Sequence, residues 1–441
     1  MPLPEMYRDA SRFVRLLACS LGLGLPGLAV GQLPQVQVPP VQVPPVQIPA
    51  GPDVRRALDG TVEQLAGARA LRVEQLVRSH RAELDRDPRG ELVVRAQVVG
   101  IDVSEAALAR AQQANFLVLR TEALPDLGVK ITVLQTPPGM SASRGLKKLR
   151  KLDPEGAYDF NHVYLDSGGV TPGAGPQTAT VETPATAGVA VRVGLIDGGV
   201  DTSHVTLRDN TVHVFGCGTA RVPSAHGTAV ASLLAGSSAN FHGAAPRAEL
   251  FAADVYCGLP AGGAVDRLAA ALGWMARERV AVINVSLVGP RNALLERVVA
   301  SLVNRGYLIV AAVGNDGPAA APLFPAAYNG VIGVTAVDAR HHVLIEACRG
   351  KHLDLAAPGA DMSAATIGNA DSFAAVRGTS FAAPIVAGLL AGELAQPDAG
   401  ARERAVASLT GSAEDLGPRG RDDIYGAGLV GADRLKLATR Q

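Results

Sequence analysis

The feature that most constrains the fold is the segment Gly378-Thr379-Ser380, which leads directly into the apolar, alanine-rich run Phe381–Leu394. This pattern predicts a buried helix with a serine at its N-terminus. Unpaired backbone N–H groups and the positive end of the helix dipole face outward at that position, which suits a nucleophile whose reaction develops an oxyanion. A serine before a helix is more often a plain cap, so the other segments of the chain must decide between the two interpretations.

Two upstream segments offer the partners that a nucleophilic serine needs. Val191–Ile196 is a short, mostly apolar run that ends at Asp197, which predicts a buried parallel strand with a carboxylate at its tip. His226 opens a second apolar helix. A serine hydroxyl needs an adjacent base, and a histidine oriented by a carboxylate can supply one. Asp197, His226 and Ser380, in this order along the chain, are therefore a candidate catalytic triad.

The region 187–441 resembles the subtilases, the subtilisin-type serine peptidases, in these three segments and in their order. Further matching segments are Gly243–Leu250, Ile283–Leu287, Val310–Pro318, Leu353–Gly359 and Tyr425–Val430. The resemblance implies a parallel α/β sheet with flanking helices and a secreted serine endopeptidase that works through an acyl-enzyme and requires no cofactor. It also implies roles for four side chains. His226 takes the Ser380 proton, Asp197 orients the imidazole, and Asn315 binds the oxyanion.

The same resemblance assigns two walls to a cleft for protein or peptide substrates. Seven residues form them: Ser286, Leu287, Val288 and Gly289 on one side, and Ala312, Val313 and Gly314 on the other. The family usually has a glycine where Val288 stands, and neither wall carries a charge. We therefore expect a narrow pocket that favours small or medium apolar residues before the scissile bond.

A metal site is not expected in the usual place. The segment Ala235–Gly243 is shorter than the calcium-binding loop that many relatives carry here, and Gly236–Asn240 offers no carboxylate ligand. The usual loop site for calcium should therefore be absent, while other calcium sites are left open.

Two other hypotheses on function belong to different classes. One is a catalytically weak binding protein that keeps the subtilase fold, against which the intact Asp197, His226, Asn315 and Ser380 argue. The other is a ligase or cyclase that passes the acyl group to an amine, which no residue specifically supports. Reaction with a fluorophosphonate separates the first from an enzyme, and a product assay in which water and an amine compete separates the second from a hydrolase.

The chain before the triad region begins with three short parts. Residues 1–31 resemble a secretory signal peptide, since arginines precede an apolar run, Leu16–Ala29, that is too short to span a bilayer comfortably. Residues 32–52 repeat a Val-Gln-Val-Pro-Pro motif, which predicts an extended spacer, and residues 53–90 have the leucine spacing of amphipathic helices. We expect a secreted, periplasmic or cell-envelope protein without a membrane span.

Residues 91–165 predict a small α+β domain of the ferredoxin-like (βαββαβ) kind. The expected strands are Glu91–Ile101, Phe116–Arg120, Val129–Gln135 and Tyr158–Leu165, and the expected helices are Ser104–Ala114 and Ser141–Leu152. Subtilase prodomains have this fold and this position, so we expect the domain to inhibit the catalytic domain and to assist its folding. Residues 166–186 predict a flexible connector where processing occurs. The last strand and the connector should lie along the active-site cleft.

Charge and cysteine content narrow the remaining choices. The chain has 41 basic and 41 acidic residues, so no basic excess points to nucleic acid as a partner. If Cys19 leaves with the signal segment, Cys217, Cys257 and Cys348 remain, and at most one intramolecular disulfide can form. Cys217 and Cys257 are the preferred pair because both flank the His226 helix. The alternative is three small buried apolar residues.

Overall fold

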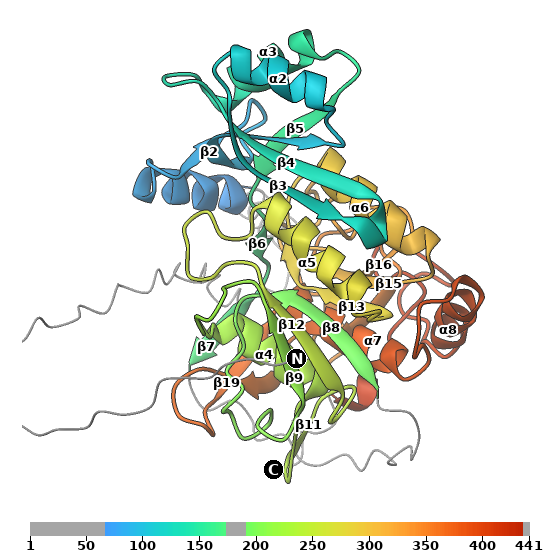
Figure 1. The fold of residues 1–441 in the computed structure, drawn as a ribbon. Helices are drawn as coiled ribbons and strands as arrows, with labels where there is room; N and C mark the ends of the chain where they lie inside the picture. The colour runs from blue at the N-terminus through green and yellow to red at the C-terminus, as the bar shows by residue number, and fades with distance from the viewer. Residues whose placement is uncertain (1–66, 173–190, 435–441) are drawn as a thin grey trace, which may run out of the picture. The chain divides into compact units, whose positions relative to one another are not determined.

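The computed structural model describes residues 67–172 and 191–434 (Figure 1). The predicted signal peptide, the Pro-rich spacer and residues 53–66 of the predicted helical segment lie outside the described residues, as do residues 173–186 of the connector. In the part of the chain that is described, no helix combines the length and apolarity needed to cross a membrane.

A parallel sheet forms the centre of the region from residue 191 onward (Figure 1). Within the described residues it has seven strands in the order β17-β16-β15-β13-β8-β12-β9, and all neighbouring pairs are parallel. The strands are β8 (Arg192–Asp197), β9 (Val212–Phe215), β12 (Glu249–Asp254), β13 (Val282–Val285), β15 (Leu308–Ala312), β16 (Val331–Val337) and β17 (Leu355–Pro358). Their apolar runs are mostly buried because helices cover both faces of the sheet.

Two pairs of helices cover this sheet. On one face lie α4 (Ala225–Ala235) and α7 (Thr379–Ala391), and on the other lie α5 (Val265–Arg277) and α6 (Ala293–Asn304). A further helix, α8 (Ala399–Gly411), packs beside α7. The predicted parallel α/β sheet with flanking helices is therefore confirmed.

The N-terminal part contains a second, antiparallel sheet. Its elements in chain order are β2 (Leu92–Ile101), α2 (Glu105–Gln113), β3 (Leu117–Leu124), η1 (Pro125–Leu127), β4 (Val129–Gln135), α3 (Ala142–Leu152) and β5 (Ala157–His162). These four strands pair in the order β5-β2-β4-β3, and a fifth strand of the sheet, β1 (Leu84–Arg86), pairs with β2. Ser104 and Ser141 cap the two helices by accepting backbone N–H groups. The order of strands and helices is the one that the sequence predicts.

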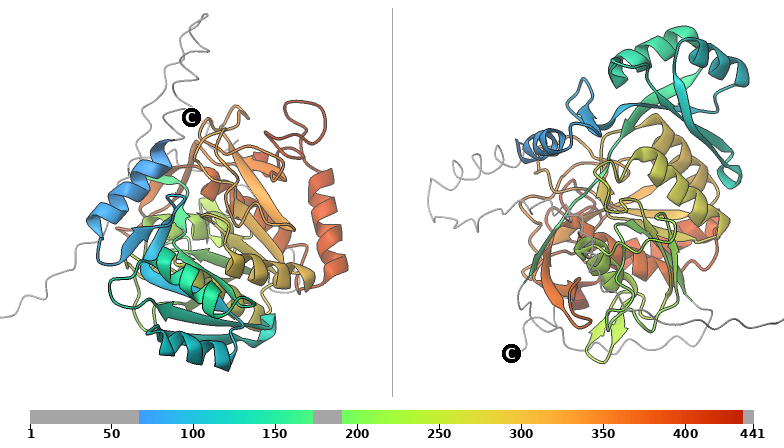
Figure 2. Two further views of the ribbon diagram at one scale, coloured as in Figure 1. Left: turned by 90° about the horizontal axis from the view of Figure 1, so that it is seen from above. Right: turned by 60° about the vertical axis from the view of Figure 1, so that its left-hand side comes forward.

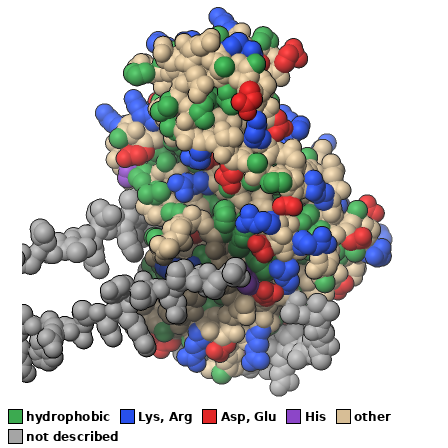
Figure 3. Space-filling model, viewed as in Figure 1, with side chains coloured by type: hydrophobic (Ala, Val, Ile, Leu, Met, Phe, Trp, Pro, Cys, Tyr) green, Lys and Arg blue, Asp and Glu red, His purple; other side chains and the backbone are tan. Residues whose placement is uncertain are grey.

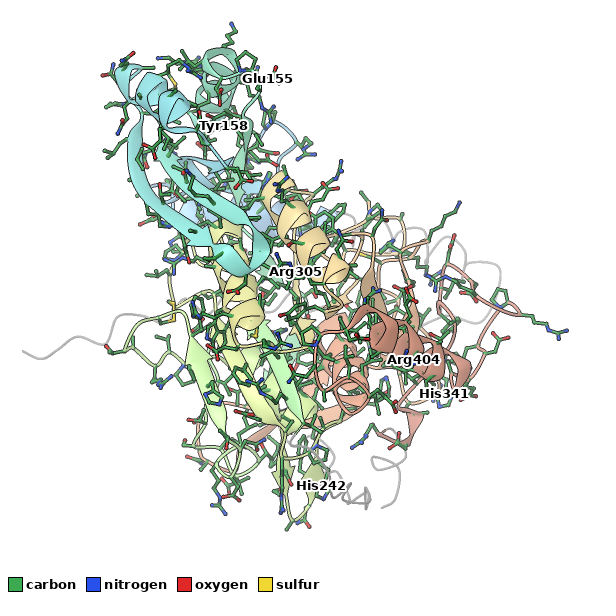
Figure 4. All side chains as sticks on the ribbon, turned by 45° about the vertical axis from the view of Figure 1, so that its right-hand side comes forward. Glu155, Tyr158, His242, Arg305, His341 and Arg404 are labelled. Carbon is green, nitrogen blue, oxygen red and sulfur yellow. A yellow bond between two sulfur atoms is a disulfide. The ribbon has the colours of Figure 1, made fainter. Side chains whose placement is uncertain are left out.

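The two faces of this antiparallel sheet have different partners. Helices α2 and α3 cover one face, and at that end the Tyr158 hydroxyl (labelled in Figure 4) donates to Asp153 at 2.9 Å. The other face lies against α5 and α6 (Figure 2), and it shares an apolar cluster with them. Polar contacts surround this cluster: Ser301 Oγ donates to the Leu127 carbonyl at 2.9 Å, and Arg297 pairs with Asp102 at 3.1 Å. The N-terminal sheet is therefore held against the helices of the larger sheet.

Three expectations about boundaries need correction. The helix of the predicted segment 53–90 runs over residues 67–79, but Leu84–Arg86 forms strand β1, because pairing with β2 lets Leu84 become fully buried. The predicted strand Tyr158–Leu165 divides after His162. The chain leaves the antiparallel sheet there, and Val163 bridges Ala264 of the larger region.

The third correction concerns the start of the predicted flexible connector. Leu165–Asp166 forms β6, which pairs with β14 (Leu287–Val288), and Gly169–Pro172 forms β7, which pairs with β19 (Phe373–Arg377). Strand β19 also pairs with β18 (Met362–Ala365). The first connector residues are regular because exposed strand edges of the larger region supply their hydrogen-bond partners. Turn composition alone does not reveal such partners.

Short elements complete the described chain: the hairpin β10 (Ser237–Ser238) and β11 (Phe241–His242), and the turn η2 (Ala432–Arg434). On the face of the molecule in Figure 3, basic and acidic side chains are interspersed rather than gathered by sign.

Candidate active site

The four predicted catalytic side chains lie at the carboxyl edge of the parallel sheet. Asp197 is the last residue of β8, and Asn315 follows β15 by three residues. His226 and Ser380 are the second residues of α4 and α7, which begin at the same edge. Carboxyl ends of parallel strands and the helix N-termini beside them meet in one place, so residues separated by nearly two hundred positions become neighbours.

Asp197 and His226 form a buried pair. The Nδ1 atom of His226 lies 2.9 Å and 3.0 Å from the two carboxylate oxygens of Asp197. Burial by itself lowers the pKa of His226, but the charge and the hydrogen bond of Asp197 outweigh it and hold that pKa above its ordinary value. With Nδ1 donating to Asp197, the Nε2 atom is the one free to accept a proton.

The Nε2 atom of His226 is buried and has no hydrogen-bond partner among the described residues. The Ser380 hydroxyl instead contacts two carbonyl oxygens, that of Ser167 at 2.6 Å and that of Ser286 at 3.1 Å. The Ser167 hydroxyl also lies 2.6 Å from it. The Ser380 hydroxyl is therefore hydrogen-bonded to Ser167, in the chain's own N-terminal part, and to Ser286, and not to the imidazole of His226.

The carbonyl oxygen of Ser167 occupies a site lined with donors. The side-chain amide of Asn315 donates to it, and so does the backbone N–H of Ser380 at 3.4 Å. The amide of Asn315 is itself oriented, because its oxygen accepts the Thr379 N–H at 3.1 Å. Two donors that converge on one carbonyl oxygen beside a serine hydroxyl are the arrangement that stabilises a tetrahedral oxyanion.

The chain around Ser167 crosses the site as an extended strand. Before Ser167, β6 pairs antiparallel with β14, so that Asp166 lies opposite Leu287 and Leu165 opposite Val288. After Ser167, β7 pairs antiparallel with β19 over residues 169–172. Main-chain pairing on both sides of one carbonyl is how an extended peptide adds to an exposed sheet edge.

Tyr164 anchors this strand three residues before Ser167. Its side chain is fully buried, and its hydroxyl donates to the Pro290 carbonyl at 2.6 Å. Its backbone N–H donates to Gly263 at 2.8 Å, and its carbonyl accepts the Tyr256 hydroxyl at 3.0 Å. The ring lies directly over Gly289, where an added Cβ would come within 2.6 Å of it. The predicted wall residue Gly289 thus makes room for Tyr164.

The helix over residues 67–79 holds the same strand through charge. Arg72 forms an ion pair with the Asp166 carboxylate and donates to the Asp166 carbonyl at 3.0 Å. Arg69 pairs with Glu91 at 2.9 Å and with Asp316, beside Asn315, at 3.5 Å. Burial raises the pKa of Asp166, but the charges of Arg72 and His226 outweigh it and lower that pKa below its ordinary value.

One of the two predicted cleft walls lies beside this strand, and on its other side the strand contacts Gly263 and Ala264 instead. Leu287 and Val288 belong to β14 and face the strand by pairing, whereas Ser286 contacts Ser380, to whose carbonyl its hydroxyl donates at 2.9 Å. Ala312, Val313 and Gly314 follow or end β15 and are buried, and Gly314 donates its N–H to the Thr379 hydroxyl at 3.1 Å. Val288 pairs with Leu165 rather than with Ser167, and its effect on the pocket stays a prediction.

The structure contains the disulfide that the sequence favours. Cys217 and Cys257 form a disulfide, and Cys348 is free and buried.

Within the described ranges, one group of three side chains has the spacing of metal ligands: Cys217, Asp254 and Cys257. Because the two sulfur atoms are bonded to each other, this group does not offer the thiolates that a metal would need. The segment Ala235–Gly243 forms the short β10–β11 hairpin, and calcium dependence stays a prediction.

Sequence reasoning missed several residues of the site. Ser167 was not singled out, although it is a small residue followed by two glycines, Gly168 and Gly169, which is a signal for a chain that must enter a narrow site. No sequence pattern pointed to a role for Arg69 and Arg72 at the site, since charged residues on an amphipathic helix usually face solvent.

Comparison with known proteins identifies the family. Residues 188–428, more than half of the chain, match the Subtilase family. The chain therefore belongs to the subtilases. Subtilisin BL from Lederbergia lenta is 33% identical over 250 residues, which are 56% of this chain and 90% of that protein. M-protease from Shouchella clausii (strain KSM-K16) has the same identity over 250 residues, and 64% of its length is matched.

A longer match extends into the N-terminal part. Subtilisin E from Bacillus subtilis (strain 168) is 30% identical over 305 residues, 65% of this chain and 77% of that protein. Among solved structures, fervidolysin from Fervidobacterium pennivorans, a keratinolytic enzyme related to subtilisin, matches with a TM-score of 0.63 at 19% identity, over 80% of this chain and 62% of that one. This likeness shows the subtilisin-like α/β fold.

Proposed function

We propose that this chain is a secreted serine endopeptidase, made as a precursor that cuts itself between Ser167 and Gly168. One observation carries the proposal: the Ser167 carbonyl lies against the Ser380 hydroxyl, and its oxygen accepts from both Asn315 and the Ser380 N–H. A bound peptide group in this position is ready for attack by the serine. Family membership supports the same chemistry.

In the proposed reaction, Ser380 Oγ attacks the carbonyl carbon of Ser167 while its proton passes to His226 Nε2. The hydroxyl must first turn away from the carbonyl oxygens that it now contacts, toward the unpartnered Nε2. Asp197 stabilises the imidazolium that forms, and Asn315 with the Ser380 N–H stabilises the oxyanion. The proton then goes to the leaving nitrogen of Gly168, and water hydrolyses the acyl-enzyme.

The N-terminal domain is proposed to act as an inhibitor and a folding aid. Strand β6, which follows the domain, pairs with β14 beside Ser380, and the sheet of the domain shares an apolar cluster with α5 and α6. A parallel sheet forms slowly because its contacts are distant in sequence, and a partner that covers two of its helices can favour the correct arrangement. We interpret the βαββαβ order of this domain as ferredoxin-like.

Secretion is proposed from two independent features. Residues 1–31 resemble a signal peptide, and Cys217 and Cys257 are joined in a disulfide, which persists in oxidising compartments. Protein or peptide chains are the proposed substrates.

The test is the fate of the purified precursor in a Ser380→Ala variant. We expect it to stay uncut, because the nucleophile is lost while the helix is retained. The wild-type protein should yield a fragment whose N-terminal residue is Gly168, identified by mass spectrometry. Ser412→Ala, an exposed serine at the end of α8, is the matched control and should be processed normally. Processing of purified Ser380→Ala at the wild-type rate would refute the assignment of the nucleophile.

A further inference from the structure

The residue after the proposed scissile bond is tightly enclosed. A Cβ atom added to Gly168 would lie 2.6 Å from Cε2 of Phe381, 3.2 Å from its Cζ and 3.3 Å from its Cδ2. From another side, a Cβ added to Gly378 would lie 2.9 Å from the Cα of Gly168, so the backbone of the turn before Ser380 is close as well. The space at Gly168 is therefore matched to a residue without a side chain.

The next residue along the chain is not enclosed. A Cβ added to Gly169 would meet its nearest neighbour, the Arg377 carbonyl oxygen, only at 4.0 Å, which is ordinary contact. Gly168 and Gly169 belong to the same extended segment and are adjacent in sequence. The restriction therefore applies to one position only and is not a general narrowness of the cleft.

Phe381 cannot easily move aside. It directly follows Ser380 in α7, and its side chain is fully buried. Its ring centroid is 5.2 Å from that of His226, so a displaced ring would press on the proposed base or on the packed core. Protein interiors have little free volume, so an added methyl group in such a place forces strain.

We propose that Phe381 determines specificity by restricting the residue after the scissile bond to glycine. The inference rests on the proposed function, since it takes the Ser167–Gly168 bond as the one that is cut. It names a substrate class: chains in which a small residue is followed by glycine, held in extended form along β14 and β19. Glycine-rich junctions between folded parts of a protein, like the one in this chain, have this chemistry.

The first test compares two single variants of the full-length precursor. Gly168→Ala should slow self-cleavage about 10- to 100-fold, because overpacking by one methyl group in a rigid site costs this much. Gly169→Ala adds the same methyl group one residue later and should slow the reaction by less than about threefold. The rate is followed as loss of precursor on a denaturing gel, with the cut position identified by mass spectrometry. Equal rates for the two variants would overturn the proposal.

A double variant separates the space at Phe381 from other effects of the alanine. Methionine is slender and flexible, so Phe381→Met should open the site. In the Phe381→Met background, Gly168→Ala should slow self-cleavage by only about threefold or less. This smaller effect would show that the two positions are coupled. If the penalty is as large as in the wild type, Phe381 is not what restricts this position.

A final assay distinguishes failure of this inference from failure of the proposed function. The self-processed wild-type protein is freed of its cut N-terminal part and divided: one portion is treated with a fluorophosphonate, and a separate, unlabelled portion is assayed on peptides that carry Tyr-Leu-Asp-Ser followed by Gly, Ala or Phe. We expect labelling, with cleavage at least tenfold faster for Gly than for Ala and slowest for Phe. Labelling with equal cleavage of all three overturns the specificity inference alone. No labelling and no cleavage would overturn the proposed function and this inference together.

Discussion

The two halves of the strand that crosses the active site are held in different ways. Before Ser167, side chains anchor the strand: Tyr164 is fully buried, and Asp166 pairs with Arg72. After it, Gly168 and Gly169 have no side chains, and β7 is held through main-chain pairing with β19 and through the packing of the partly buried Val170 against the core. If the bond between the halves is cut, the first half keeps its buried ring and its ion pair, whereas the second half keeps its pairing with β19 and one partly buried apolar side chain.

This difference suggests how one segment can be both substrate and inhibitor. We expect the glycine half to leave the site more readily after cleavage, because backbone hydrogen bonds and the packing of Val170 against the core retain it. We expect the anchored half to stay in the cleft and to block it, supported by the contact of the N-terminal sheet with α5 and α6. Release of the inhibitor should then depend on the anchors before Ser167 rather than on the residues after it.

The largest expected effect is on the rate of self-cleavage at the bond between the two halves. Asn315→Ala removes a donor to the Ser167 carbonyl oxygen. We expect self-cleavage to slow by roughly 10²- to 10³-fold, the loss known for this kind of oxyanion donor in subtilisin itself. Gel assays of the precursor over time give the rate. A rate within threefold of the wild type would show that the Asn315 amide does not stabilise the transition state.

Removing the apolar anchor should have the next largest effect. Tyr164→Ala deletes a buried ring and leaves a cavity against Gly289, which costs about 3 kcal/mol or more and corresponds to roughly 100-fold weaker retention of the cut N-terminal part. Retention is measured by size-exclusion chromatography after processing, together with the rise of peptide hydrolysis. Thr171→Ala, an exposed position in the glycine half, is the control and should leave retention unaltered. Similar behaviour of the two variants would remove the contrast between the halves.

Removing the charged anchor should have a smaller effect. The side chains of Arg72 and Asp166 are 24% and 34% exposed, so solvent screens their attraction. Arg72→Ala should weaken retention by only about fivefold, or about 1 kcal/mol, and the difference from the wild type should shrink as salt is added. Arg78→Ala is the control, since Arg78 pairs within its own helix with Glu74. An effect of Arg72→Ala that is independent of salt would indicate lost packing rather than lost charge.

The smallest effect is a shift in pH dependence. The charge of Asp166 contributes to raising the pKa of His226. Asp166→Asn should therefore lower that pKa. Because His226 must be neutral to accept the Ser380 proton, the acid limb of the self-cleavage profile should move to lower pH. Asp102→Asn is the control, since Asp102 pairs with Arg297 of α6, and it should leave the limb in place. A shift of the limb to higher pH in Asp166→Asn would contradict the assigned geometry.

Several features of this protein could be predicted from sequence because they are local. The strand that ends at Asp197, the helix that starts at His226 and the turn before Ser380 each carry a short pattern of apolar and small residues. Caps such as Ser104 and Ser141 fix helix starts through contacts three residues away. The disulfide between Cys217 and Cys257 could be preferred from their positions around one helix. Such signals involve few residues, so the sequence alone determined the fold class and the candidate triad.

Only the tertiary structure decided which residues of the N-terminal part meet the site. The contact of Ser167 with Ser380 joins residues 213 positions apart, and nothing in either local sequence specifies the other. The same holds for Gly168 beside Phe381, and for Arg72, whose helix pattern predicted only an amphipathic surface. Strands β6 and β7 are regular because partners elsewhere in the chain complete their hydrogen bonds, whereas their own composition favours a flexible connector. Contacts between distant segments depend on how whole sheets pack, and that information is not contained in any short stretch of sequence.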